Sequence, residues 1–280
     1  MKQLYGVIGN PIGHSMSPDI HNAALQDKNI NGQYFAFQVE PHHLKDAVNG
    51  IKALGICGVN VTVPHKVAIM EHLDEIHESA KVLGAVNTVK REGDRLIGYN
   101  TDGDGFYKSL VKVLDKPISE LSILMIGAGG AARAIFTTIV RGEPKQFDVC
   151  NRTPEKAENL IAAAPSFQQK RALTLKEAEN QLEQYDVIIH TTSVGMYPKT
   201  DAVPLSLERA KTGAIVCDIV YNPIQTAFLK EAEKRGLTTL DGVGMFVEQA
   251  ALSFKLWTEQ EPDSGLMRAI VEGKLGGTQC

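Results

Sequence analysis

The chain has 280 residues, of which 43% are hydrophobic and 22% are charged, and its formal net charge is -4. This length favours two compact domains of roughly 100–200 residues each over a single one. The negative charge excludes a general attraction to nucleic acid or to anionic membranes, so an anionic ligand must be held by local charges. No apolar run approaches the roughly 20 residues that span a bilayer, and the first ten residues lack the apolar core of a signal peptide. The four cysteines are scattered without metal-ligand spacing, which predicts a reduced, cytoplasmic protein.

Strand-length apolar runs alternate with amphipathic segments of helix length over the first hundred residues. This alternation is typical of an α/β architecture with mostly parallel strands. The second segment begins with Ser17 and Pro18, a pair that suits the start of a helix. The predicted elements are a strand at 3–9, a helix at 18–28, a strand at 33–39, a helix at 41–54, a strand at 57–63 and a hairpin of 85–90 with 95–100.

From residue 121 onward the alternation becomes regular and predicts a Rossmann-like unit of βαβ crossovers. The predicted strands are 121–126, 147–150, 185–191, 214–219 and 237–240, and the helices between them are 131–140, 154–164 and 225–234. Two more helices, 245–257 and 265–272, follow the last strand. We expect them to pack back on the first domain, so the predicted domains are 1–103 with 241–280, and 104–240.

A glycine-rich turn joins strand 121–126 to helix 131–140 and reads Gly127-Ala128-Gly129-Gly130-Ala131-Ala132. Gly127 permits a tight turn, and Gly129 and Gly130 let the backbone approach a pyrophosphate. Ala132 stands where a small residue allows close helix–strand packing. The free N–H groups at the helix N-terminus then favour the phosphates. The alternative is an ordinary βα turn without a ligand, but the strand–turn–helix setting favours a dinucleotide.

The next strand ends in Asn151-Arg152-Thr153, with Lys156 one turn later. An NAD enzyme usually places a carboxylate at this strand end to bind the ribose 2′-hydroxyl, and none is present. An arginine can instead bind a 2′-phosphate and stack on the adenine, which favours NADP, although Arg152 could also be an ordinary solvated charge. Thr192 and Ser193 end the following strand and suit a loop against the cofactor, or simply a strand-to-loop transition.

Four polar clusters lie at the ends of predicted strands in the first domain. Ser15 and Ser17 stand at a helix N-terminus, where two hydroxyls would make a neutral anchor for a carboxylate. The other three clusters span residues 60–66, 84–88 and 100–103 and contain Thr62, Lys66, Asn87 and Asp102. Any one of them alone is more often a turn or a helix cap.

The ordered motifs resemble those of the shikimate dehydrogenase family, and the resemblance covers essentially the whole chain. They are GxxxxHSxSP, NVTxPxK, GAVNT, NTDG, GAGGAAR, NRT, TSxGM and DIVYNP. The match is most similar to the NADP-dependent biosynthetic branch. It implies an N-terminal α/β substrate domain, a Rossmann-like NADP domain and C-terminal helices that return to the first domain. The implied reaction is the reversible, NADPH-dependent reduction of 3-dehydroshikimate to shikimate in the shikimate pathway of aromatic amino acid and chorismate biosynthesis.

The same resemblance implies a role for each matching residue. Lys66 and Asp102 would form the catalytic pair, in which the lysine donates a proton to the developing alkoxide. The alternative is an ordinary salt bridge between domains. Substrate ligands would be Ser15, Ser17 and Tyr221 at the carboxylate, and Thr62, Asn87 and Gln249 at the ring hydroxyls. The backbone around Ile219, Gly242 and Met245 would face the nicotinamide, and no metal is expected.

Two other functions are open from the sequence. A related dehydrogenase could take quinate or another cyclohexane-type hydroxy acid, with NAD as an alternative cofactor, but Ser15 and Asn151-Arg152 disfavour it. A dinucleotide-sensing regulatory protein could keep the fold without turnover, yet it would need neither the Lys66–Asp102 pair nor the substrate hydroxyls. A monomer and a homodimer both fit a chain of this length.

Overall fold

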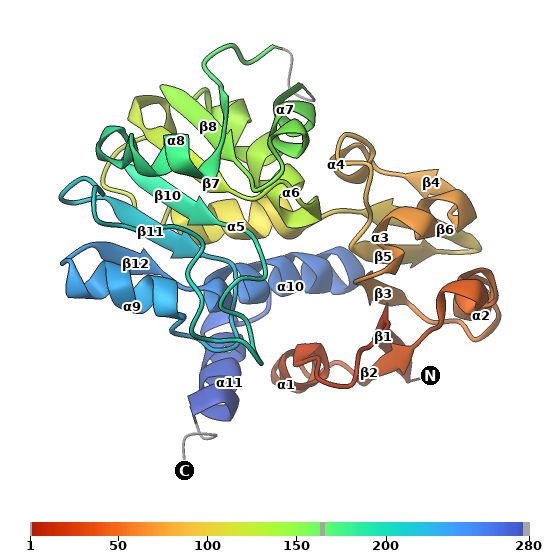
Figure 1. Ribbon diagram of the computed structural model, residues 1–280. Helices are drawn as coiled ribbons and strands as arrows, with labels where there is room; N and C mark the ends of the chain where they lie inside the picture. The colour runs from red at the N-terminus through yellow and green to blue at the C-terminus, as the bar shows by residue number, and fades with distance from the viewer. Residues whose placement is uncertain (1, 163–165, 277–280) are drawn as a thin grey trace. The chain divides into compact units, whose positions relative to one another are not determined.

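The computed structural model describes residues 2–162 and 166–276, and the chain divides into two compact units (Figure 1). The first unit comprises Met1–Asp102 and Val247–Gly276, and the second comprises Gly103–Phe246. The sequence placed the second boundary at residue 240, whereas here it lies inside the 17-residue helix α10 (Gly242–Thr258). Because α10 is continuous, its first turn belongs to one unit and the rest of it to the other. Among the described residues, no helix combines the length and the apolar character needed to cross a membrane.

The first unit contains a six-stranded sheet in the order β2-β1-β3-β5-β6-β4. Its strands are β1 (Gln3–Gly9), β2 (Gly32–Gln38), β3 (Gly58–Val61), β4 (Glu75–Ile76), β5 (Thr88–Glu92) and β6 (Arg95–Tyr99). β1 pairs in parallel with β2 and β3, whereas β5 runs antiparallel to both β3 and β6. The expected hairpin is therefore present as β5 and β6, and it makes this sheet mixed.

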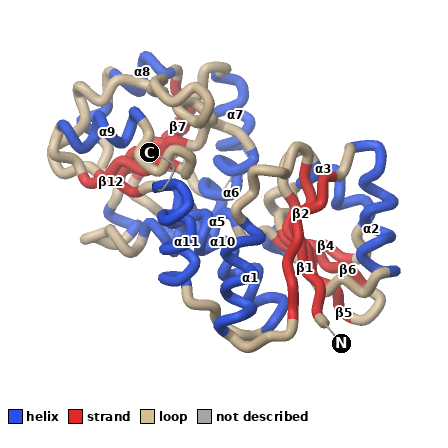
Figure 2. Tube along the Cα trace, turned by 90° about the horizontal axis from the view of Figure 1, so that it is seen from below, coloured by secondary structure: helices blue, strands red, loops and turns tan. Residues whose placement is uncertain are grey.

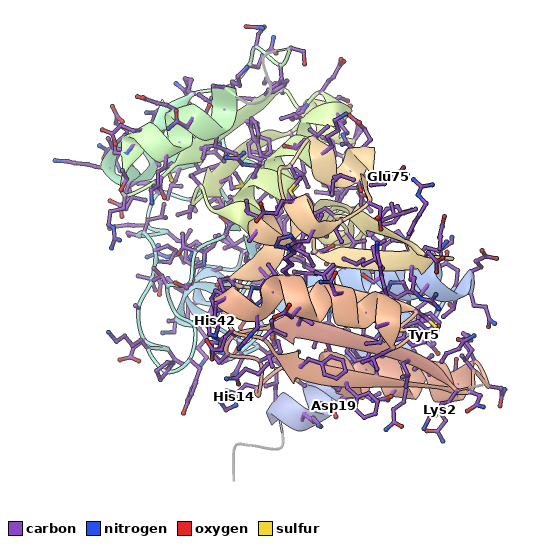
Figure 3. All side chains as sticks on the ribbon, turned by 90° about the vertical axis from the view of Figure 1, so that its right-hand side faces the viewer. Lys2, Tyr5, His14, Asp19, His42 and Glu75 are labelled. Carbon is purple, nitrogen blue, oxygen red and sulfur yellow. The ribbon has the colours of Figure 1, made fainter. Side chains whose placement is uncertain are left out.

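Helices pack on this sheet. They are α1 (Ser17–Asp27), α2 (Leu44–Ala53), α3 (His65–Ala68), α4 (Glu78–Lys81), α10 from Val247 onward and α11 (Ser264–Gly276), with 3-10 turns at Pro41–His43 and Ile69–His72. The core beside α2 and α4 is aliphatic, whereas aromatic rings of β1, β2 and α10 pack around His21 of α1. Figure 2 shows α1 beside α11, and Lys274 of α11 forms an ion pair with Asp19 of α1 at 2.6 Å. Figure 3 draws the side chains, with Tyr5 of β1 and Asp19 labelled. The C-terminal helix thus returns to the first unit, as the sequence predicted.

Helix α1 begins at Ser17 itself, and Met16 occupies the N-cap position without a side-chain capping bond. Pro18 then lies in the first turn, where its missing N–H costs nothing. The Ser17 side chain is buried and forms no capping bond of this helix; its hydroxyl contacts Tyr34 instead.

The second unit contains a six-stranded, fully parallel sheet in the order β12-β11-β10-β7-β8-β9. Its strands are β7 (Ser122–Ile126), β8 (Gln146–Cys150), β9 (Ala172–Leu173), β10 (Val187–His190), β11 (Ile215–Asp218) and β12 (Thr238–Leu240). All five residues of β7 are buried, as a central strand covered on both faces requires. The strand order reverses between β7 and β10, and ligands of such sheets bind beyond the strand ends at this switch point.

The helices of the second unit are α5 (Asp102–Leu110), α6 (Gly130–Ile139), α7 (Pro154–Ala162), α8 (Leu175–Glu179) and α9 (Ala227–Lys234), with 3-10 turns at Ile118–Glu120, Val140–Gly142 and Leu182–Gln184. The predicted end of α7 at residue 164 lies outside the described residues. The sequence prediction missed β9 and α8, because two and five residues are too short to show a period. Thr174 and Glu177 form a capping box at the start of α8, a signal that could have revealed it.

Candidate functional site

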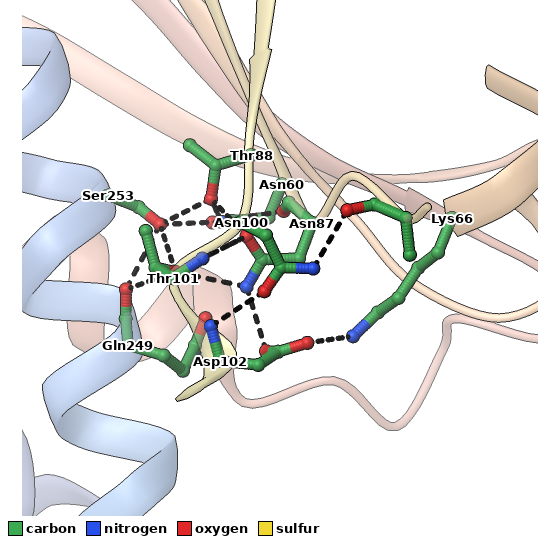
Figure 4. A network of polar contacts seen from close by, with 10 residues as sticks. Asn60, Lys66, Asn87, Thr88, Asn100, Thr101, Asp102, Gln249 and Ser253 are labelled. Atoms are coloured by element: carbon green, nitrogen blue, oxygen red, sulfur yellow. Dashed lines mark hydrogen bonds and ion pairs between the residues drawn. The ribbon is translucent and has the colours of Figure 1, made fainter. Parts of the chain in front are cut away.

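The expected catalytic pair lies within the first unit as an ion pair (Figure 4). Lys66 lies on α3, directly after the buried strand β3, and Asp102 is the first residue of α5. Nζ of Lys66 lies 2.7 Å from Oδ2 of Asp102, and the two side chains are 28% and 11% exposed. Both charged groups are thus partly withdrawn from water but still accessible to a small molecule.

Asn87 holds the carboxylate of this pair in place. Its Nδ2 donates to Oδ1 of Asp102 at 2.8 Å and also to Oγ1 of Thr101 at 3.0 Å. Its Oδ1 accepts the N–H of Thr101 at 2.9 Å. The N–H of Asp102 donates to Oδ1 of Asn100 at 3.0 Å. Because each Asp102 oxygen has its own donor, the carboxylate keeps one orientation.

Helix α10 joins this network through Ser253, which is fully buried. Oγ of Ser253 accepts from Nδ2 of Asn60 at 2.9 Å, donates to the carbonyl of Gln249 at 3.0 Å and lies 2.7 Å from Oγ1 of Thr88. The hydroxyl of Thr101 also donates to the Gln249 carbonyl, at 3.1 Å. The backbone of Gln249, an expected substrate ligand, is therefore fixed beside the Asn87 cluster. Asn60 and Thr88 belong to the polar clusters seen in the sequence but had no predicted role. Ser253 was not predicted at all, although it follows Gln249 by four residues and so shares its helix face.

The two expected carboxylate-anchoring serines adjoin the same network. Oγ of Ser15 accepts the N–H of Ser17 at 3.3 Å. The hydroxyl of Tyr34 donates to Oδ1 of Asn60 at 2.8 Å. Burial raises the pKa of Tyr34 well above its ordinary value, and a hydrogen bond with Ser17 partly offsets this rise. A buried chain of polar contacts thus runs from Ser17 through Tyr34 to Asn60.

Thr62 and Tyr221 are the remaining expected substrate ligands. Thr62 follows β3, and its carbonyl accepts the N–H of His65 at the turn that carries Lys66, at 2.9 Å. Tyr221 belongs to the second unit, where its ring stacks on Phe246 with centroids 4.7 Å apart. Burial raises the pKa of Tyr221, so its hydroxyl keeps its proton and can donate a hydrogen bond.

The glycine turn of the second unit has two parts with different reasons for glycine. Gly127 has φ +114°, and a Cβ placed on it would lie 2.5 Å from Oγ1 of Thr191. At Gly129 and Gly130, by contrast, an added Cβ would meet no atom within 4 Å. The fold therefore requires glycine at Gly127 but leaves the surface over Gly129 and Gly130 bare.

This bare surface lies at the N-terminus of the ten-residue helix α6. Backbone N–H groups at such a terminus bind phosphates, and the missing side chains let a pyrophosphate approach closely. Ala132, the fully buried third residue of α6, provides the close helix–strand contact. The residues present therefore fit the pyrophosphate of a dinucleotide. Ala128 and Ala131, also predicted for this site, are the other small residues of the turn and the first turn of α6.

The end of β8 carries the residues expected to select NADP. Nδ2 of Asn151 donates to the carbonyl of Thr153 at 2.9 Å and so closes the turn between them. Arg152, Thr153 and Lys156 are all exposed. Because β8 is the parallel neighbour of β7, this turn and the glycine turn emerge at the same edge of the sheet. No carboxylate stands at this strand end, so the charge here suits a phosphate.

The other expected cofactor-binding residues, a loop against the cofactor and the backbone beside the nicotinamide, follow β10 and β11 at that edge. Thr192 and Ser193 follow β10 after Thr191, and Ile219 comes directly after β11. A Cβ on Gly242 would lie 2.4 Å from the carbonyl oxygen of Ile219, so glycine is required there. Met245 is buried in the core of the second unit, and its side chain has a packing role.

Three family models match the chain in order. They are the shikimate dehydrogenase substrate binding domain at residues 7–89, shikimate / quinate 5-dehydrogenase at 109–233 and the shikimate 5'-dehydrogenase C-terminal domain at 242–272. The chain is 75% identical over 280 residues to shikimate dehydrogenase (NADP(+)) of Bacillus subtilis (strain 168), with 100% of both chains covered.

Solved structures of shikimate dehydrogenases are also similar to this chain. One is a shikimate dehydrogenase in complex with NADP+, with 40% identity, TM-score 0.91 and coverage of 98% of this chain and 96% of that chain. Another is shikimate 5-dehydrogenase from Thermus thermophilus in complex with NADP(H) and shikimate. It has 33% identity, TM-score 0.88 and coverage of 96% of this chain and 98% of that chain.

Proposed function

Because the chain belongs to the shikimate dehydrogenase family, we propose that it reduces 3-dehydroshikimate to shikimate reversibly with NADPH. The reaction is a step of the shikimate pathway, which leads to chorismate and the aromatic amino acids. The observation that carries the proposal is the Lys66–Asp102 pair at 2.7 Å, embedded in a buried polar network that holds Asp102 in one orientation.

Lys66 is the proton donor in this proposal. NADPH, when bound, supplies a hydride to the substrate carbonyl, whose oxygen then becomes strongly basic. The Lys66 ammonium has three N–H donors, of which one is directed to Asp102, and another can give its proton to that oxygen. Asp102 orients the ammonium and stabilises its charge before the transfer. In the reverse direction the neutral amine of Lys66 removes the proton from the substrate hydroxyl.

The other expected ligands would bind and orient the substrate. Ser15 and Ser17, with Tyr221 of the second unit, would donate hydrogen bonds to the substrate carboxylate. Uncharged donors cost less desolvation than a buried arginine would. Thr62, Asn87 and Gln249 would bind the ring hydroxyls. We accordingly propose that residues 1–102 and 247–276 form the substrate domain.

The second unit would hold NADP through its strand ends. The turn from Gly127 to Ala131 would bind the pyrophosphate against the N-terminus of α6. The 2′-phosphate would be bound by Arg152 and Lys156, with Asn151 and Thr153 shaping the turn. Thr192 and Ser193 would lie against the cofactor, and the backbone around Ile219, Gly242 and Met245 would face the nicotinamide. The cytoplasm as the place of action, and the choice between monomer and homodimer, stay predictions.

A spectrophotometric assay at 340 nm with NADP+ or NAD+ against shikimate or quinate tests the proposed activity. We expect NADP+ with shikimate to give the highest kcat/KM of the four pairs. A preference for NAD+ with quinate would contradict the proposal and favour the related quinate enzyme instead. The absence of turnover with all four pairs, together with tight NADP+ binding, would favour a sensor.

Lys66→Ala tests the proton donor directly. General acid–base catalysis contributes about 10²–10⁴-fold, so kcat should fall by roughly that factor while the NADP+ dissociation constant stays within about twofold. Lys52→Ala is the matched control, because Lys52 forms an ion pair of 2.8 Å with Asp74 elsewhere in the first unit. The control should keep the wild-type kcat. Unchanged turnover in Lys66→Ala would refute the assignment.

A further inference from the structure

Two buried polar side chains end neighbouring strands of the second unit, and neither has a predicted role from the sequence. His190 is the last residue of β10, Asp218 is the last residue of β11, and the two are register partners in the sheet. Both side chains are 0% exposed, and Nδ1 of His190 lies 3.0 Å from Oδ1 of Asp218. Burying a carboxylate costs free energy unless hydrogen bonds or a counter-charge compensate for the lost water, so we asked what this pair does.

His190 sets the orientation of Thr192. Nε2 of His190 lies 2.6 Å from Oγ1 of Thr192, and this oxygen also accepts the N–H of Val194 at 3.2 Å. This contact is a hydrogen bond in either imidazole tautomer, with Nε2 as acceptor or as donor. The hydroxyl is therefore turned toward the imidazole. The methyl group faces the glycine turn instead, since a Cβ on Gly127 would lie 2.8 Å from Cγ2 of Thr192.

Asp218 fixes the chain that follows β11. Its Oδ1 accepts the N–H of Val220 at 2.9 Å, and its Oδ2 accepts the hydroxyl of Thr226 at 2.8 Å. Ile219 lies between Asp218 and Val220 and is held by the first of these bonds; its carbonyl oxygen would lie 2.4 Å from a Cβ on Gly242. Asp218 thereby sets the backbone that Gly242 contacts at the start of α10.

We propose that His190 and Asp218 are positioning residues for NADP(H). Together they set the Thr192 loop against the Gly127 turn and hold Ile219 beside Gly242, so that the pyrophosphate and nicotinamide parts of the site keep one relative geometry. Both side chains are fully buried, so they act through these loops and touch neither cofactor nor substrate. The inference rests on the proposed function, because it assigns these loops to the dinucleotide.

His190→Phe in the full chain tests the proposal, because it keeps a planar ring and removes both nitrogens. The readout is the NADP+ dissociation constant from isothermal titration calorimetry without substrate. We expect it to rise about tenfold, which corresponds to about 1.4 kcal/mol. The KM for shikimate at saturating NADP+ should change less than twofold. His190→Asn keeps an amide that can donate to Asp218, and we expect it to restore part of the affinity.

Tyr185→Phe is the matched control for a general loss of stability. Tyr185 is fully buried, and its hydroxyl donates to Oδ2 of Asp148 at 2.7 Å near the start of β10, at the opposite edge of the sheet. This variant should lower the melting temperature and leave NADP+ binding unchanged. Wild-type affinity in His190→Phe, or equal weakening in both variants at equal loss of stability, would overturn the proposal. A wild-type protein that neither binds NADP+ nor oxidises shikimate would overturn the proposed function itself, and this inference with it.

Discussion

His21 makes the stability of the first unit depend on pH. Its side chain lies on α1, 1% exposed, and neither ring nitrogen has a hydrogen-bond partner within the described part of the chain. The ring stacks on Tyr34 with centroids 4.4 Å apart and an interplanar angle of 3°, and Trp257 lies 5.4 Å away. Tyr5, Leu25 and Phe254 complete this largely apolar surrounding. Burial without a counter-charge lowers the pKa of His21 to about 3.

The size of the effect follows from proton linkage. Above about pH 6.5 the His21 imidazole is neutral in both the folded and the unfolded chain, so it adds no pH dependence there. Below that pH the unfolded chain binds a proton at His21 that the folded chain does not bind. The free energy of unfolding therefore falls as pH falls. At pH 5, about 1.5 pH units lower and at about 1.36 kcal/mol per unit, the loss is about 2 kcal/mol. The loss continues to grow until the pH approaches the folded pKa of about 3.

His21→Phe removes the titrating group and keeps a planar ring for Tyr34. Trp257 is the only tryptophan of the chain, so urea unfolding followed by its fluorescence reports on the first unit. Between pH 7 and pH 5 the wild type should lose about 2 kcal/mol more than His21→Phe. His42→Ala, a change at an exposed ring, is the control and should behave like the wild type. An equal loss in wild type and His21→Phe would show that the folded state protonates His21, and the reasoning would fail.

Four further substitutions separate ligand binding from folding. Arg152→Ala should weaken NADP+ about 10–100-fold and NAD+ hardly at all, since a hydrogen bond to a charged group contributes about 1.5–3 kcal/mol; equal losses in titrations with both cofactors would refute the 2′-phosphate role. Gly127→Ala should lower the melting temperature, because it places a side chain at φ +114°, at a cost of about 1–3 kcal/mol. Gly129→Ala should keep the wild-type melting temperature and raise the KM for NADP+. Ser253→Ala should cost about 1–3 kcal/mol in urea unfolding and raise the KM for shikimate, because buried partners lose a hydrogen bond; a wild-type KM would separate this serine from the substrate site.

Features that depend on a few neighbouring residues could be predicted before any fold was known. The turn at Gly127 is one of them, because its backbone conformation and the strand before it are local properties. Arg152 and Lys66 likewise belong to short motifs, so a role for each could be predicted from the sequence. Short elements could not be predicted in this way, because β9 and α8 contain too few residues to show a hydrophobic period.

The meeting of distant polar side chains, by contrast, became visible only in the folded chain. Asn60 and Ser253 are 193 residues apart in the chain and still share a hydrogen bond of 2.9 Å. No local sequence pattern predicts this contact. His190 and Asp218 face each other because β10 and β11 pair in one particular register. The physical reason is the same in both cases. Local sequence sets backbone conformation over a few residues, whereas contacts between distant side chains follow from strand order, register and burial, which emerge only when the whole core is packed.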